Sequence, residues 1–156
     1  QVVYAGQGQT LIGPYHPQQQ NDDIPLPAHT LYAPDMLTQL RQKLAINAVI
    51  NPLTALYRCR NGELVTNVDY RRQLHVLAAE IAGFYTFLNW PLPWDLIEQA
   101  EHVAAATAAN QSSTLQDVLK DRPTELHYIN GYLIAQAKQL GYALPHSTEL
   151  MKKLST

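Results

Sequence analysis

Apolar residues recur at the spacing of an α-helix through most of the chain after residue 35. Leu74, Leu77 and Ile81, for example, follow one another at three- and four-residue intervals, which places them on one face of a helix. Capping residues and glycines indicate where such helices begin and end. The pattern predicts a mainly α domain, with helices over residues 35–51, 69–88, 95–109 and 113–120, one from Pro123 to Gly141, and a last one capped by Ser147.

The first 35 residues have a different pattern. Residues 2–5 and 9–12 are strand-like runs on either side of a Gly6-Gln7-Gly8 turn, which predicts a β-hairpin over residues 1–13. The turn lacks the third glycine of a dinucleotide-binding loop, and no helix follows it. Residues 14–35 are rich in proline and predict a linker, with one further short strand at residues 29–32. We therefore divide the chain into residues 1–35 and residues 36–156.

A polar stripe marks the first predicted helix, for which Asp35 is a suitable N-cap. Lys43, Asn47 and Asn51 recur every four residues, so they share one face of a helix whose other positions are apolar. A helix that is apolar on most sides is normally buried, and a cation there has to be paired or to line a wet cleft. The stripe indicates a polar substrate in a cleft, although a plain solvated stripe has the same spacing.

Two signals are expected to end this helix. Pro52 removes a backbone donor and disfavours helical geometry at the residue before it, so it predicts an interruption, with a continuation over residues 53–57 after a kink as the alternative. The Asn61-Gly62 pair predicts a stop further along the chain. Later, Ser113-Thr114-Leu115-Gln116 has the form of a capping box, which predicts Ser113 as a helix N-cap.

Composition narrows the classes of partner. Apolar residues make up 46% of the chain, charged residues 15%, and the net charge is −2, so no nucleic-acid partner is expected. No apolar run approaches the roughly 20 residues that span a membrane, and no signal peptide is evident. Cys59 is alone, so it is interpreted as structural in a reducing, cytoplasmic compartment, and the histidine spacing predicts no metal site.

Two longer motifs carry a resemblance to a known family. The first is Lys-x-x-x-Asn-x-x-x-Asn-Pro-Leu-Thr-Ala over residues 43–55, followed by Asn-Gly-Glu-Leu at 61–64. The second is Ser-Ser-x-x-Gln-Asp at 112–117, followed by Thr-Glu-x-x-Tyr-Ile-Asn-Gly at 124–131. In this order they resemble the C-terminal domain of ketopantoate reductase (2-dehydropantoate 2-reductase). The resemblance covers about residues 36–154, and residues 1–13 look like the last strands of that family's nucleotide-binding domain.

The resemblance implies a helical domain of the 6-phosphogluconate-dehydrogenase-like type and a function. The family transfers a hydride from NADPH to ketopantoate, giving pantoate for pantothenate and coenzyme A biosynthesis. By resemblance, Lys43 is the general acid, Glu125 orients the substrate and Lys43, and Asn47, Asn51 and Ser113 bind the substrate. The cofactor is expected mainly on an N-terminal domain without a counterpart here, so the chain alone is expected to be inactive, and its own cofactor-binding residues stay unassigned.

The residues leave other interpretations open. A related 2-keto or 3-hydroxy acid reductase would carry the same helical domain, and a non-catalytic helical dimerisation module would not need the cofactor domain. Helical domains of this kind can form homodimers through apolar faces, but no face of this sequence indicates one. Because the chain begins with Gln1 rather than methionine, we expect it to be a processed, separately cloned or truncated piece.

Overall fold

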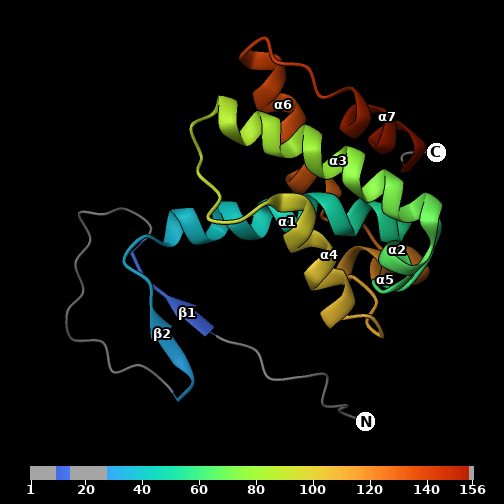
Figure 1. Cartoon of the computed structure of the whole chain (residues 1–156), viewed down its shortest axis with the longest axis horizontal. Coiled ribbons are helices and arrows are strands. Elements are labelled where there is room, and N and C mark those ends of the chain that lie inside the picture. The colour runs from blue at the N-terminus through green and yellow to red at the C-terminus, as the bar shows by residue number, and fades with distance from the viewer. Residues whose placement is uncertain (1–9, 15–27, 155–156) are drawn as a thin grey trace. The chain divides into compact units, whose positions relative to one another are not determined.

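The structure, a computed structural model, describes residues 10–14 and 28–154 (Figure 1). The chain divides into two compact units, residues 1–42 and residues 43–156, which are described separately. Its described elements in chain order are β1 (Thr10–Ile12), β2 (Thr30–Tyr32), α1 (Met36–Tyr57), α2 (Glu63–Thr66), α3 (Val68–Phe87), α4 (Leu96–Ala106), α5 (Ser113–Leu119), the π-helical segment η1 (His127–Gly131), α6 (Tyr132–Gln139) and α7 (Pro145–Leu154). The predicted mainly helical fold class is confirmed. None of the described helices has the length and hydropathy that crossing a membrane requires.

The first unit contains a short two-stranded sheet. β1 and β2 pair in parallel, with Thr10 opposite Thr30. The strand predicted at residues 29–32 is therefore confirmed, and the second strand of the predicted hairpin corresponds to β1. The first strand of that hairpin lies outside the described residues. Asp35 is the N-cap of α1, as predicted, because its carboxylate accepts the Thr38 amide N–H at 3.1 Å.

Helix α1 runs through Pro52, so the predicted interruption is wrong. Every residue from Ala48 to Ala55 is buried, so this part of the helix is packed on all sides. In a regular helix the amide N–H of residue 52 would donate to the Ala48 carbonyl, but proline has no N–H. The Ala48 carbonyl instead accepts a hydrogen bond of 2.9 Å from the Asn130 side chain. The helix continues because a distant residue supplies the missing donor.

The end of α1 agrees with the alternative prediction of a continuation over residues 53–57, although the stop does not come from Asn61-Gly62. The helix ends at Tyr57, and Arg58 takes the left-handed conformation with a φ of 49°, so the stop comes before Asn61-Gly62. Gly62 instead provides a close approach to the segment after α4. Its amide donates to the Ala108 carbonyl at 3.1 Å, and a Cβ at position 62 would lie 2.6 Å from the Ala108 Cβ. Only glycine fits there without a shift of backbone.

The hydrophobic core of the second unit forms around α1. Figure 1 shows α7 beside one side of α3, with α2 and α4 on its other side, in agreement with their contacts. Tyr57 of α1 stacks on Tyr70 of α3 with ring centroids 4.0 Å apart. The largest side chains that are fully buried come from several helices; among them are Leu64, Leu74, Ile81, Phe84, Tyr85, Leu96, Leu115 and Leu133. The period-3.6 pattern predicted this core over α3 correctly.

The C-terminal helices begin at other residues than the sequence indicates. The helix expected from Pro123 begins after Glu125 with η1, and it ends as predicted near Gly141, which has a φ of 69°. Ser147 lies inside α7 and is not its cap. The cap comes from Glu80 of α3, whose carboxylate accepts the amides of His146 and Ser147, both at 2.8 Å, and the Ser147 hydroxyl at 2.7 Å. Glu80 therefore has a structural role.

An ion-pair cluster joins α3 to α4. Arg71 donates through Nε and Nη2 to the two Glu101 carboxylate oxygens, at 2.5 and 2.9 Å, and His75 Nε2 also contacts this carboxylate. Hydrogen bonds from Arg71 and then from His75 lower the pKa of Glu101 from its ordinary value of 4.5 to about 2. The cluster therefore stabilises the folded state while Glu101 is ionised.

We predict that Glu101→Gln lowers the free energy of unfolding at pH 7 by about 1 kcal/mol, a value reduced for the partial exposure of the pair. Because the folded pKa lies below the unfolded one, this stability is present above pH 4.5 and is lost as the pH falls toward about 2. Urea titrations of both proteins from pH 7 to pH 3 should show a shrinking difference. Glu98→Gln on the same helix is the control, with a change within about 0.5 kcal/mol. A difference that does not depend on pH would contradict this role.

Candidate functional site

The polar stripe of α1 passes from solvent into the core. Lys43 is exposed, Asn47 is half-buried, and Asn51 is only 6% exposed. The side chain of Asn51 makes no hydrogen bond with any other described residue, although a carboxamide offers two donors and an acceptor. Buried polar groups are normally paired with protein, water or a ligand. The inner end of the stripe therefore offers unused hydrogen-bonding capacity at a nearly enclosed position.

Helix α5 begins at this inner end. Thr54 follows Lys43 by about three helical turns and so belongs to the same face of α1. The Thr54 and Ser112 hydroxyl oxygens are 2.7 Å apart, and both side chains are buried. Ser112, not Ser113, is the N-cap of α5, because its Oγ accepts the Leu115 amide N–H at 3.0 Å. The capping prediction for Ser113 was wrong by one residue, and Ser113 is the exposed first residue of the helix.

The direction of these hydrogen bonds follows from the donors available. The Thr54 hydroxyl donates to the backbone carbonyls of Ile50 and Asn51, at 3.1 and 2.9 Å, and so spends its single proton. The Ser112 hydroxyl must then donate to Thr54 Oγ1 while it accepts the Leu115 amide. Ser112 is thereby fixed from both sides, and the start of α5, with Ser113, is fixed against α1.

A second connection brings the segment that carries Glu125 to α1. Asn130, which is fully buried in η1, donates from Nδ2 to the Ala48 carbonyl. The backbone carbonyl of Glu125 accepts the amides of Tyr128 and Ile129, at 2.9 and 3.1 Å, so Glu125 stands at the start of this short helix. Its own side chain is exposed. The two hydrogen-bonded connections therefore place α5 and η1 against the helix that carries the stripe.

The five predicted site residues lie on α1, at the start of α5 and just before η1, and they do not bond to one another. In the described parts of the chain, no hydrogen bond or ion pair joins any two of Lys43, Asn47, Asn51, Ser113 and Glu125. Lys43, Ser113 and Glu125 are exposed and available to a ligand. The arrangement can present one cation, one carboxylate, a hydroxyl and two carboxamides, which suits a small polar substrate that bears a carboxylate or a carbonyl.

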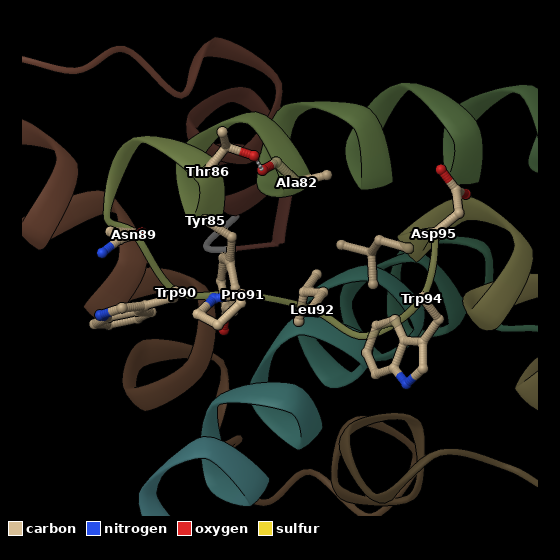
Figure 2. Close-up of a pocket in the computed structure, with 10 residues that line it drawn as sticks. Ala82, Tyr85, Thr86, Asn89, Trp90, Pro91, Leu92, Trp94 and Asp95 are labelled. Carbon is tan, nitrogen blue, oxygen red and sulfur yellow. Dashed lines mark hydrogen bonds between the residues drawn. The ribbon is translucent and has the colours of Figure 1, made fainter.

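Other candidate chemistry lies elsewhere. Cys59 is buried, and burial, with the nearby Glu63 carboxylate, raises the pKa of its thiol to about 11, which fits the structural role expected of it. Within the described residues, no three His, Cys, Asp or Glu side chains gather into a group that could hold a metal ion. A cavity of about 350 Å³ lies between the end of α3 and the Trp90–Trp94 corner (Figure 2), and its lining includes none of the five predicted residues.

Sequence reasoning missed the residues that fix the site. Ser112, Thr54 and Asn130 were not assigned any role, yet each makes a buried side-chain hydrogen bond between elements. All three lie within the two family motifs, at residues 43–55, 112–117 and 124–131. The sequence alone does not separate a motif residue that contacts substrate from one that holds a helix in place.

Comparison with known proteins agrees with the motif evidence. Residues 35–156 match the sequence model of a family described as ketopantoate reductase PanE/ApbA, C terminal. A 2-dehydropantoate 2-reductase from Salmonella typhi is 36% identical over an alignment 165 positions long, which covers 97% of this chain and 51% of the relative. The chain thus spans about half the length of the curated relatives it matches.

Solved structures agree on the fold. A probable 2-dehydropantoate 2-reductase from Bacillus subtilis matches with a TM-score of 0.72 and 33% identity, covering 81% of this chain and 42% of the other. D-mandelate dehydrogenase, solved with NADH and anilino(oxo)acetate, matches with a TM-score of 0.70 over the same shares, but at 19% identity it indicates only a shared fold. The family match and the identity to curated relatives are sufficient for assignment: this chain belongs to the ketopantoate reductase family and corresponds to its C-terminal domain.

Proposed function

We propose that this chain is the substrate-binding and catalytic domain of an NADPH-dependent reductase that converts 2-dehydropantoate to pantoate. The observation that supports it most directly is Asn51, a nearly buried carboxamide with no partner among the described residues, on the same helix face as Lys43. Its carboxamide can bind a ligand that both donates and accepts hydrogen bonds, as a hydroxylated keto acid does. The names of the curated relatives supply the substrate.

Lys43 is the proposed general acid. When the keto carbon accepts a hydride, the carbonyl electron pair moves to the oxygen, and the resulting alkoxide takes a proton from the Lys43 ammonium. General acid catalysis of this kind contributes a factor of about 10²–10⁴ in rate. Exposure of Lys43 on α1 leaves its ammonium accessible to a substrate oxygen.

The other four side chains are proposed to bind and orient the substrate. Asn47 and Asn51 would hydrogen-bond its hydroxyl and carbonyl oxygens without adding charge. Ser113 would donate its hydroxyl to the substrate carboxylate from the first residue of α5. Glu125 would accept from a substrate hydroxyl and orient the Lys43 ammonium by charge.

The turn between β2 and α1 does not have the sequence of a dinucleotide-binding loop. Between β2 and α1 the chain passes through Ala33, Pro34 and Asp35, without a glycine, so this turn does not form the glycine-rich loop that approaches a pyrophosphate. NADPH, which would supply the hydride, is therefore proposed to bind mainly to a separate nucleotide-binding domain, with residues 1–35 as the end of that domain and its linker. On this proposal the chain alone has no reductase activity.

A second reductase function has one observation in its favour. D-mandelate dehydrogenase has the same fold, so the fold is compatible with reduction of other 2-keto acids. Comparing kcat/KM for 2-dehydropantoate with that for other 2-keto acids distinguishes the two functions. The homodimer and the cytoplasmic location stay predictions, and sedimentation of the chain tests the former.

We predict that Lys43→Ala lowers kcat at least about a hundredfold for NADPH oxidation driven by 2-dehydropantoate, because the alkoxide loses its proton donor. The assay uses the chain together with whatever natural sequence precedes it. Lys138→Ala, which removes an exposed lysine from α6, is the control and should leave kcat unchanged. Near-normal turnover in the Lys43 variant would refute the proposed role.

The adjacent serines provide a matched pair. We expect Ser112→Ala to lower the free energy of unfolding by about 1–3 kcal/mol, because it removes the N-cap of α5 and the bond to Thr54. Ser113→Ala, on an exposed residue, should change it by less than about 0.5 kcal/mol while it raises KM for 2-dehydropantoate. Urea unfolding and steady-state kinetics measure the two effects. A Ser113 variant with unchanged KM would remove this residue from the proposed site.

A further inference from the structure

Pro52 creates a specific defect in the middle of a buried helix. In an α-helix, the carbonyl of Ala48 would accept the amide N–H of residue 52, but proline has none. Ala48 and Pro52 are both buried, so water does not replace the missing donor readily. The defect is repaired by Asn130, whose Nδ2 lies 2.9 Å from the Ala48 carbonyl oxygen although the two residues are 82 positions apart.

The geometry of Asn130 indicates that the donor is the reason for its presence. The side chain is fully buried, and its Oδ1 has no hydrogen-bond partner among the described residues. An unpaired buried acceptor is unfavourable, so burial of a carboxamide here is stabilising only through its donor. The role of Asn130 therefore depends on the two elements that its hydrogen bond to Ala48 connects.

That bond joins η1 to α1. Asn130 lies about one helical turn after Glu125, whose backbone carbonyl holds the amides of Tyr128 and Ile129. A force that fixes Asn130 on Ala48 therefore also fixes the turn from which the Glu125 side chain projects. On α1, Ala48 lies between Asn47 and Asn51, which are two members of the polar stripe.

We infer that Asn130 is a positioning residue: it supplies the hydrogen-bond donor that Pro52 lacks, and through this bond it holds the Glu125 segment against the helix that carries Lys43, Asn47 and Asn51. The second half of the inference rests on the proposed function, and the first half does not. Because Pro52 lacks an amide N–H, the Ala48 carbonyl of α1 is left to accept a hydrogen bond from a different element.

The first test is a double-mutant cycle on the folded chain, followed by urea unfolding. Asn130→Ala should raise the unfolding equilibrium constant by about tenfold to a hundredfold, because it leaves the Ala48 carbonyl unpaired. In Pro52→Ala, the new amide N–H at position 52 can pair with that carbonyl. The effect of Asn130→Ala in this background should then fall to less than about fivefold.

A control cycle combines Pro52→Ala with Glu80→Gln, because Glu80 caps α7 and shares no partner with Pro52. These two effects should multiply without coupling. If Asn130→Ala has the same effect in both backgrounds, the repair of the Pro52 defect by Asn130 is refuted.

The second test separates positioning from stability. In the doubly substituted chain, Pro52→Ala with Asn130→Ala, the amide of residue 52 can pair with the Ala48 carbonyl, but no side-chain bond joins η1 to α1. We expect the amides of Tyr128 and Ile129 to exchange with solvent at least about tenfold faster than in the unsubstituted chain, even with folding stability recovered. KM for 2-dehydropantoate should stay raised at least about fivefold in the active protein.

The outcomes are distinct. Exchange and KM that both return to the unsubstituted values in the doubly substituted protein would show that Asn130 only repairs the helix, and would refute the positioning role. If the unsubstituted protein does not reduce 2-dehydropantoate at all, the proposed function fails, while the unfolding cycle and the amide exchange still decide whether Asn130 holds this segment to α1.

Discussion

The fold depends on keeping a proline-containing helix intact at its centre. Helix α1 is buried all round from Ala48 to Ala55, so a break there would expose backbone groups inside the core. The hydrogen bond from Asn130 to the Ala48 carbonyl removes that problem. It also makes α1 dependent on η1, because the helix cannot satisfy this carbonyl by itself. The amide N–H that Pro52 lacks is thus replaced by a tertiary hydrogen bond between η1 and α1.

Buried and partly buried polar side chains of the second unit act in the same manner. Thr54 with Ser112 holds the start of α5, Asn130 with Ala48 holds η1, and Glu80 holds the start of α7. Each of these bonds joins elements that are far apart in sequence, and each has a definite direction that hydrophobic contacts lack. Apolar burial supplies the bulk of the stability, whereas these bonds determine which helix end lies at which point of the core.

The sequence predicted what depends on local periodicity and missed what depends on distant partners. The apolar spacing located α3 because this helix buries one face, and the capping box located α5 to within one residue of its N-cap. The predicted interruption at Pro52 failed because the donor for the Ala48 carbonyl comes from Asn130, 82 positions away, and no local sequence pattern contains it. Ser112 and Ser113 could not be ranked, since either serine can cap a helix, and only contact with Thr54 decides between them. The candidate site residues came from the family resemblance and the α1 stripe, and their roles are proposals.

The exposure of the site residues has a consequence for the proposed chemistry. Lys43 and Glu125 project from rigid, hydrogen-bonded elements, but both side chains are exposed. A lysine that is a good proton donor at neutral pH needs some loss of hydration, which favours release of its proton. Lys43 is exposed in the described structure, so under the proposed function the bound substrate has to exclude water from its ammonium. On that proposal the helical domain would supply the positions of the reacting groups, and the electrostatic environment would form only when the substrate is bound.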